Sequence, residues 1–581
     1  MTSQPDEHMT ILHPEAQGWQ LRAVLLSLIL TLLLSALDQT IVGTALPRII
    51  ADLQGFDRYP WVLTAYLLAS TTMVPIVGKL SDQFGRKWFL IAGVLIFLIG
   101  SALAGTSQTM NDLILFRGLQ GLGAGIAQTL CFTVVADLFP PDERAQWQGI
   151  FTAIFGLASV IGPAAGGWIT DHLGWRWVFF INLPLGAVAL MALLIWLPRA
   201  QSLQETTTRG WAAVRRVDLL GALTAASATV CLLLGLSWGG QTYPWTSWQI
   251  IGSLSAACIL FIVFFFVERG AREPILPLSL LRNQIFATSA LLTLLIGMAL
   301  LALTVYIPLF IQDVQGQSAT NSGIVVTPLM VSLTVASILC GALVSRLHCY
   351  QWSVVLGAAL LTLGAFLMTR VTFATSSLAI TGNMIVLGLG VGATLPIVTV
   401  AVQNAIPQHL LGAGTGAISY LRQLGSTLGV ALIGTVVNTT FADELAHHLP
   451  PTASHLPHTV LAAATSLQIL QSATAQQSLK HRFVQGAVQQ TVAQIPPGPQ
   501  HNQMVTQVTA RVTTQVTSLL DQIFSASRDA LVIGIEHAFV GALAICGAIL
   551  VVSFFLKDVS FKQQGQPLPL EVENGKRGGT K

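Results

Sequence analysis

Two ionisable residues stand inside long apolar runs of the sequence, where charges are rare. Asp38 lies in the run 21–44, and Arg117 lies in the run 111–137. A charge near the middle of a bilayer costs about 3 kcal/mol on insertion scales. If the two runs cross a membrane in opposite directions, both residues lie ~9 Å from the same membrane face. This matched depth predicts that carboxylate and guanidinium neutralise each other, although Arg117 could instead snorkel to the surface.

A carboxyl group in this position is suited to carrying a proton. Burial favours the protonated form of a carboxyl group, whereas a nearby guanidinium favours the ionised form. Movement of Asp38 relative to Arg117 would therefore change its protonation. We assign proton coupling to these two residues, with the ionised carboxylate paired to Arg117 or to a cationic substrate. The alternative is a structural ion pair that never titrates.

The stretch "GKLSDQFGRKW", which starts at Gly78, concentrates charge and glycine between two apolar runs. Gly78 and Gly85 permit a tight turn and a close helix contact. Asp82, Arg86 and Lys87 put charges of both signs at one membrane surface. An ordinary positively charged loop would explain the Arg and the Lys but neither Asp82 nor the glycines. The stretch therefore predicts a specific contact.

A second glycine-rich stretch, "GLASVIGPAAGGW", starts at Gly156 inside an apolar run. Gly162 and Gly166 form a GxxxG pair, which allows close helix packing. Pro163 removes a backbone hydrogen bond and invites a kink. Packing alone could explain the glycines, including Gly167. Their grouping around a proline instead favours a bend at a pair of helices that move.

The composition is that of an integral membrane protein. Of the 581 residues, 53% are hydrophobic and only 9% are charged, whereas soluble domains carry about a quarter charged residues. The net charge of +3 is small, and we expect no nucleic-acid partner. The six cysteines are scattered singly, which supports neither a metal site nor a disulfide framework. No nucleophile, base and orienting residue occur at workable spacing, so we expect no enzyme activity.

Continuous apolar runs predict membrane-spanning helices and exclude a β-barrel, whose strands would show short alternating segments. Lys and Arg concentrate in alternate short loops, which predicts cytoplasmic N- and C-termini and a multi-pass protein of the cytoplasmic membrane. The fourteen expected spans are about 21–44, 61–80, 88–106, 111–137, 148–170, 176–197, 217–237, 248–267, 286–311, 322–345, 353–370, 376–401, 415–440 and 531–556.

A long polar segment, 441–530, separates the last two spans on the expected outer side. From Val505 onward, apolar residues recur at spacings of three and four, so we predict that 501–530 is a helix continuous with the last span. It should project from the surface and fold back, beyond "PPGP" at 496–499, onto the preceding segment. Histidines at the start of the loop could bind a metal, but a solvated polar loop is the simpler interpretation.

Several stretches resemble motifs of one transporter superfamily. The segments 78–88, 117–125 ("RGLQGLGAG") and 156–168 resemble the three signature motifs of the major facilitator superfamily, the third being its antiporter motif. Other stretches are similar to the fourteen-span drug:proton antiporter family, the QacA/EmrB-like multidrug exporters: "LDQTIVGTALP" (37–47), "WRWVFFINLPLG" (175–186), "REPILPLSLL" (272–281) and "RQLGSTLGVALIGT" (422–435).

The resemblance implies an all-α integral membrane protein with the major facilitator fold. Two six-helix bundles and two inserted helices would alternate access to a cavity at the membrane midplane. The expected parts are a cytoplasmic tail (1–20), a first bundle (21–197), a linker with the two extra helices (198–285), a second bundle (286–556) that includes the outer insertion 441–530, and a second tail (557–581).

The resemblance also implies moving parts. Asp82 and Arg86, with Gly78, Gly85 and Lys87, would form a conformational latch with the acid at the end of the fourth span, here Asp137. Gly156, Gly162, Gly166 and Gly167 with Pro163 would form the antiporter hinge. The matching loop of the second half, "GALVSRLHCY", has Ser345 where an acid is expected. We therefore predict a weak latch in that half.

The expected function is proton-coupled antiport that exports amphipathic or cationic drugs, or other hydrophobic small molecules, without a cofactor. One alternative is a dedicated exporter of one endogenous metabolite, lipid, siderophore or antibiotic. Another is a membrane assembly or receptor protein whose segment 441–530 binds a partner at the outer face. Candidate cavity residues, each more often a packing residue, are Tyr66, Phe132, Phe155, Tyr306, Gln403, Asn404 and Tyr420.

Overall fold

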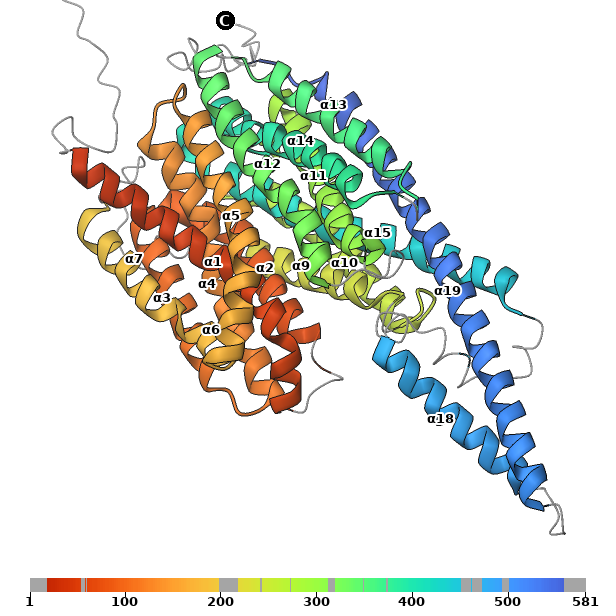
Figure 1. Cartoon of the computed structure of the whole chain (residues 1–581). Helices are drawn as coiled ribbons and strands as arrows, with labels where there is room; N and C mark the ends of the chain where they lie inside the picture. The colour runs from red at the N-terminus through yellow and green to blue at the C-terminus, as the bar shows by residue number, and fades with distance from the viewer. Residues whose placement is uncertain are drawn as a thin grey trace, which may run out of the picture.

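The computed structural model of the chain is built from α-helices (Figure 1). Fourteen helices in the described part are long and apolar enough to cross a membrane, which confirms the number of spans expected from the sequence. The one piece of β-structure in that part is an isolated bridge between Gly239 and Tyr243. The structure describes residues 18–53, 58, 60–197, 218–240, 243–271, 273–311, 319–347, 349–372, 375–450, 461, 473–493 and 501–558.

The first group of helices packs around α1 and α4, which contact each other. Helix α4 also packs against α2 and α3, and α1 packs against α5 and α7, so the two central helices are enclosed. The group consists of α1 (Gly18–Leu53), α2 (Pro60–Phe84), α3 (Arg86–Thr106), α4 (Met110–Leu138), α5 (Arg144–His172), α6 (Trp177–Phe180) and α7 (Asn182–Trp196).

The second group lies beside the first, in green to blue in Figure 1. It consists of α11 (Gln284–Leu309), α12 (Ala319–Leu347), α13 (Gln351–Met368), α14 (Ser377–Ala405), α15 (Leu411–His448) and α19 (His501–Ser553). Between the groups in sequence come α9 (Leu219–Trp238) and α10 (Trp248–Gly270), which pair with each other. Helix α9 also contacts α2 and α15, so this inserted pair lies against both groups.

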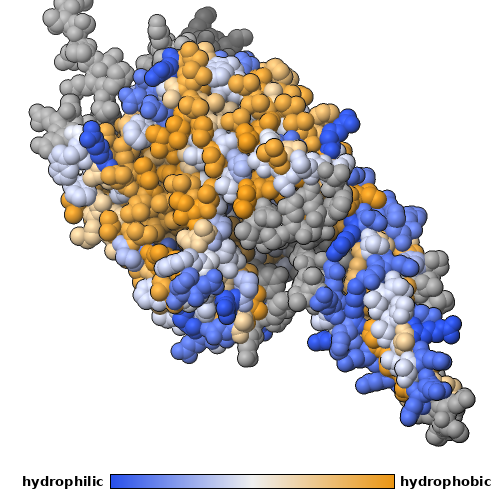
Figure 2. Space-filling view, viewed as in Figure 1, coloured by the Kyte–Doolittle hydropathy of each residue, from blue (hydrophilic) through white to orange (hydrophobic). Residues whose placement is uncertain are grey.

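The surface of the helical body agrees with a membrane environment. In Figure 2 an apolar band covers the body, and hydrophilic residues gather at its ends and on the projecting arm. Large apolar side chains such as Leu115, Trp248 and Leu378 are exposed on this body. In water such a surface would be unstable, whereas in lipid it is matched by the acyl chains.

Local chemistry sets the helix ends that hold the charged motifs. Gly85 separates α2 from α3 with a φ of 88°, a backbone conformation that favours glycine. At the opposite end of α3, Thr109 caps α4 and Asp112 reciprocates in a capping box. Tight turns of this kind keep the motif starting at Gly78 at the end of the body where α2 meets α3.

Several helices extend beyond the apolar runs that predicted them. Helix α1 continues to Leu53, past Pro47, instead of ending near residue 44, and α15 continues to His448 instead of residue 440. The span expected at 176–197 consists of two helices, because the chain turns at Ile181 between α6 and α7. Hydropathy marks the part of a helix that suits lipid, not the residue at which the helix ends.

The helix predicted over 501–530 is confirmed: these residues belong to α19, a single helix that continues through the last span to Ser553. The preceding helix α18 (Ala473–Val492) packs against it, so the two form an antiparallel arm (Figure 1). Leu520, Ile523 and Phe524 are buried there, against side chains that include Leu479 and Phe483. The "PPGP" sequence at 496–499 and most of both tails lie outside the described residues.

Candidate functional site: a caged carboxylate and a latch between bundles

Asp38 lies in the interior of the first bundle and is held by side chains from two other helices. Arg117 of α4 donates from Nη1 to Asp38 Oδ2, and both side chains are 0% exposed. Gln120 Nε2, one turn along α4, donates to Asp38 Oδ1 at 2.8 Å. Asn182 Nδ2 of α7 donates to the same oxygen at 3.2 Å. The sequence-based pairing of Asp38 with Arg117 is therefore present in the structure.

The arginine side of this site is also enclosed. The guanidinium carbon of Arg117 lies 4.2 Å from the centroid of the Tyr66 ring, and its Nε donates to the carbonyl of Val62. Tyr66 in turn donates its hydroxyl to the carbonyl of Ser35 at 3.3 Å. Tyr66 is 1% exposed, so the structure places it in the Asp38 site and not among groups that face an open cavity.

The contacts enclose the Asp38 carboxylate in a cage of hydrogen-bond donors. Three side chains donate to the two Asp38 oxygens, and loss of the carboxylate charge would leave Arg117 buried without a counter-charge, a state that costs several kcal/mol. Sequence reasoning missed Gln120 and Asn182. Gln120 could have been found, because it follows Arg117 by three residues and shares its helix face. Asn182 could not, because no local spacing places α7 beside α1.

The acid of the first signature motif bridges the two bundles. Asp82 at the end of α2 accepts hydrogen bonds from the backbone N–H groups of Gly412 (2.9 Å) and Ala413 (2.8 Å). These are N–H groups of the first turn of α15, which has no side-chain cap of its own. Asp82 therefore acts as the N-terminal cap of a helix in the other bundle, where negative charge is favoured.

Arg86 connects this cap to the rest of the first bundle. Its Nη2 donates to Asp82 at 2.9 Å, and its Nη1 pairs with Asp137 and donates to the carbonyl of Thr133. The three charged residues thus lie together as the sequence suggested. Lys87 donates to the carbonyl groups of Leu194 and Leu197 at the end of α7.

A further ion pair ties the motif to the segment that follows the inserted helices. Lys79 Nζ lies 2.9 Å from Glu273 Oε2, and Gln83 donates to the same oxygen. Glu273 lies between α10 and α11. The first bundle therefore contacts both α15 and the connection that leads into the second bundle.

A second set of contacts crosses the interface near the start of α5. Arg144 donates to the Gln403 carbonyl (3.2 Å) and to Asn404 Oδ1 (2.9 Å), both on α14. Asn404 also donates to the Tyr350 hydroxyl, and Gln148 donates to Gln403 Oε1 at 3.1 Å. Burial raises the pKa of the Tyr350 phenol, which keeps it neutral. Gln403 and Asn404 therefore lie in an interbundle lock, not among side chains free to line a cavity.

The contact that corresponds to Asp82 in the second half is neutral. Ser345 Oγ of α12 accepts a hydrogen bond from the backbone N–H of Gln146 at 3.2 Å, in the first turn of α5. The two halves thus each cap a helix of the other bundle, with a carboxylate in one case and a hydroxyl in the other. We call the end of the body where these contacts gather the latch end.

The glycines of α5 face two different partners. A Cβ atom on Gly162 or Gly166 would lie less than 3.0 Å from side-chain atoms of α1, and one on Gly156 would lie as close to Met330 and Thr334 of α12. Pro163 stands between them inside the helix. Gly167 has open space around it, so close packing does not explain that position.

The remaining cavity candidates divide by location. Phe132 of α4 and Phe155 of α5 stack with ring centroids 6.3 Å apart and planes 6° from parallel. Tyr306 belongs to the core cluster of the second bundle. The Tyr420 hydroxyl lies 2.6 Å from the Thr229 hydroxyl of α9, so Tyr420 contacts the inserted helix pair. Of the seven candidates, the stacked phenylalanines alone form an apolar pair in mid-helix positions of the first bundle.

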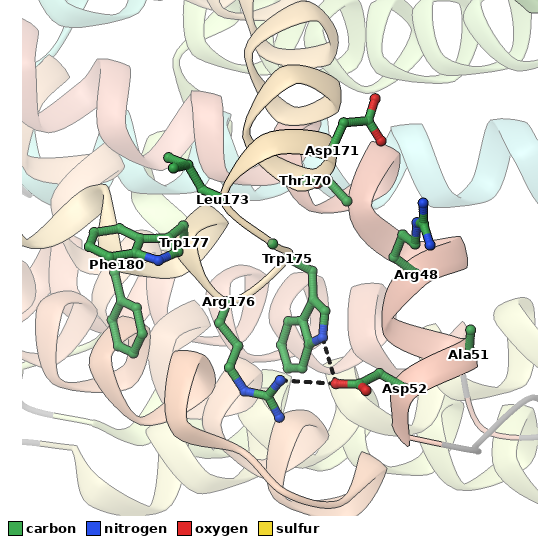
Figure 3. Close-up of a pocket in the computed structure, with 11 residues that line it drawn as sticks. Arg48, Ala51, Asp52, Thr170, Asp171, Leu173, Trp175, Arg176, Trp177 and Phe180 are labelled. Atoms are coloured by element: carbon green, nitrogen blue, oxygen red, sulfur yellow. Dashed lines mark hydrogen bonds and ion pairs between the residues drawn. The ribbon is translucent and has the colours of Figure 1, made fainter.

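A pocket of about 640 Å³ lies elsewhere, where the end of α1 meets the connection from α5 to α6 (Figure 3). Asp52 accepts hydrogen bonds there from Trp175 Nε1 and Arg176 Nη1, each at 2.9 Å. Asp52 follows Asp38 by about 21 Å of helix. The pocket is therefore separate from the caged carboxylate, and no cluster of metal-binding side chains occurs in the described ranges.

Comparisons with known proteins agree with this architecture. The family model for the Major Facilitator Superfamily matches residues 28–430. The chain is 40% identical over 479 residues to "Multidrug transporter protein MdtP" of Bacillus subtilis, covering 82% of this chain and 87% of that protein. It is 40% identical over 422 residues to "Multidrug resistance protein 3" of the same organism, covering 73% and 80%.

A solved structure shares the fold. The proton:xylose symporter XylE superposes with a TM-score of 0.53 at 14% identity, covering 74% of this chain and 91% of that one. At this identity the likeness concerns the fold alone. The family match, the relatives and the fourteen helices together show that this chain is a membrane transporter of the major facilitator superfamily, not an enzyme.

Proposed function

We propose that the chain is a proton-coupled antiporter that exports amphipathic small molecules across the cytoplasmic membrane. Two relatives at 40% identity carry names as multidrug transport or resistance proteins, which supports drug efflux. The observation that carries the coupling is the Asp38 carboxylate, which lies within the membrane-spanning body and is held by three donors. An intramembrane acid of this kind marks a proton or ion pathway.

The latch end faces the cytoplasm in this proposal, with both termini on the same side. The first turn of α1 and the last turn of α19 lie at one end of the body (Figure 1). Positively charged side chains of the latch, including Lys79, Arg86 and Arg144, suit the cytoplasmic surface. Interbundle contacts gather at this end, so the described conformation corresponds to one closed toward the cytoplasm.

Proton coupling would work by remaking the contacts of Asp38. Protonation removes the charge that holds Arg117, Gln120 and Asn182, and so weakens the contacts among α1, α4 and α7. No substrate can touch Asp38 in this conformation, because its side chain is 0% exposed. The proton and the substrate would therefore compete through a change in bundle conformation, as expected for alternating access.

The direct test is drug survival and transport in a host lacking its own pumps. Wild type should confer resistance to several unrelated amphipathic compounds, and Asp38→Asn should confer none. In proteoliposomes the same variant should lose uphill export driven by a proton gradient, yet still allow downhill movement. Full proton-driven export by Asp38→Asn would refute the coupling role.

Two rival functions give other outcomes in this test. A dedicated exporter of one endogenous metabolite, lipid, siderophore or antibiotic would transport that compound and give no broad resistance. A membrane assembly or receptor protein would show no transport, and its activity would depend on the α18–α19 arm. The intact cage around Asp38 favours transport over the second rival.

A further inference from the structure

Arg422 of α15 is a cation within the membrane-spanning body that the protein leaves without a counter-charge. Within the described ranges its side chain forms no ion pair and no hydrogen bond. Its guanidinium carbon lies 5.8 Å from the centroid of the Phe155 ring, which belongs to the other bundle. The side chain is partly exposed, not buried.

The other arginines in the body show that this is unusual. Arg117 pairs with Asp38, Arg86 pairs with two acids, and Arg144 donates to a carbonyl and an amide oxygen. An unpaired arginine at the centre of a membrane helix costs about 3 kcal/mol on insertion scales. A ligand that accepts hydrogen bonds from the Arg422 guanidinium would offset this free-energy cost.

Arg422 lies where the two bundles meet, at mid-depth. The next residue, Gln423, accepts a hydrogen bond from Thr71 of α2 at 2.6 Å, which fixes this turn of α15 against the first bundle. Arg422 and Phe155 each lie ~16 Å along their helices from the latch end. Transporters of this architecture bind substrate near the membrane midplane, between their two halves.

The groups at the depth of Arg422 indicate what would bind. Phe155 is stacked on Phe132, so the two rings offer an apolar face. Gln128, one turn before Phe132 on α4 and ~15 Å from the latch end, has a buried amide nitrogen without an acceptor among the described residues. Arg422 and the Gln128 amide nitrogen are donors, and the unpaired hydroxyl of Ser337, also ~15 Å from the latch end on α12, can donate as well. The missing partner is therefore an oxygen acceptor.

We infer that Arg422 binds an anionic oxygen group of the exported compound, with the Phe132–Phe155 pair holding its apolar part. The planar guanidinium matches a carboxylate in a bidentate arrangement. This inference rests on the proposed export function and narrows its substrates to amphipathic acids and zwitterions. A simple cation would be repelled by Arg422, and Asp38 is enclosed in its own cage and cannot serve as a counter-charge.

The test uses three probes with one ring system and different charges: 2-naphthylacetate, 2-naphthylacetamide and 2-naphthylethylamine. Binding to the purified full-length protein is measured for wild type, Arg422→Gln and Arg422→Lys. The matched control is Arg370→Gln, because Arg370 also lies over a phenylalanine ring, that of Phe366 at 5.2 Å, but just beyond the end of α13 and not in mid-helix. Proteoliposome uptake of the same probes measures transport separately.

Wild type should bind the carboxylate at least tenfold more tightly than the amide or the amine. Arg422→Gln should weaken carboxylate binding about 10- to 100-fold, the range of a charge-assisted hydrogen bond, and leave amide binding within twofold. Carboxylate binding by Arg422→Lys should be intermediate between wild type and Arg422→Gln, because lysine keeps the positive charge but cannot donate two parallel hydrogen bonds. Arg370→Gln should change nothing.

Three results would overturn the inference: no carboxylate binding by wild type, preference for the amine, or equal losses for carboxylate and amide in Arg422→Gln. In each case transport of other compounds would leave the proposed export function standing. Conversely, Arg422-dependent carboxylate binding without uptake of any probe would uphold the binding site and count against export.

Discussion

Replacement of Asp82 by asparagine tests whether one bundle caps a helix of the other. The variant keeps the size of the side chain and one acceptor oxygen. It removes the charge that faces the first turn of α15 and leaves Gly412 or Ala413 facing an amide NH₂ group. Transport should fall, whereas substrate binding should be largely unchanged, because the cavity is untouched.

The size of the effect follows from the contacts. Loss of a helix cap costs about 1 kcal/mol, and loss of a carboxylate at a partly buried helix N-terminus costs up to about 2 kcal/mol. A shift of about 1–3 kcal/mol changes a two-state equilibrium by roughly 5- to 150-fold. Asp82→Asn should therefore move a protein that is almost wholly closed at the latch end to one with a measurable open population.

Spin labels at Phe84 and Leu347 report on this equilibrium, because both side chains are exposed and belong to different bundles. Pulsed electron resonance in a background without the native cysteines should show a second, longer distance in Asp82→Asn. Asp137→Asn is the matched control: it removes another acid from Arg86 without touching α15, and should give a smaller change. Equal changes in the two variants, or loss of substrate binding in step with transport, would refute the cap.

Three further predictions concern the other contacts. Arg117→Gln should lower the melting temperature in detergent, because it leaves the Asp38 charge buried without a partner, at a cost of about 3–5 kcal/mol. Adding Asp38→Asn to the same chain should restore much of the lost stability. If the two stability losses instead simply added, the pairing of Asp38 with Arg117 would be refuted. Gly156→Val should separate α5 from α12 and abolish transport, because its side chain meets Met330 and Thr334, whereas Gly167→Ala should be silent in the same transport assay. Spin labels at 508 and 523 should lie ~22 Å apart along α19, and a shorter distance would show that α19 is bent. Phe524→Asp, which puts a charge among the buried residues of the arm, should detach α18 without changing that distance.

The sequence predicts those parts of the site that depend on depth along a helix. Asp38 and Arg117 can be paired from their positions in two apolar runs, and Asp82 and Arg86 lie four residues apart, on either side of the turn at Gly85. Contacts that depend on bundle docking leave no such pattern. The capping of α15 by Asp82, the bonds of Arg144 to Gln403 and Asn404, and the place of Tyr66 under Arg117 each join residues far apart in sequence.

The arm also shows where local patterns suffice. Its apolar stripe predicted a helix and a partner, because both are consequences of spacing along one segment. Helix ends were predicted less well, since α1 and α15 continue past the apolar runs, to Leu53 and His448. The sequence could not predict that Arg422 is unpaired, because only the packing of the helices shows that no acid in the described residues reaches it.

The single helix α19 has a mechanical consequence. It packs against α11, α13 and α15 within the second bundle and continues without a break into the arm. Its outer part, residues 501–530, is ~45 Å long, so a rotation of the bundle by about 10° would carry the tip through ~8 Å. If the bundles rotate during transport, as we propose, the tip of the arm would move with α19, and a molecule bound to the arm would sense the conformation of the transporter.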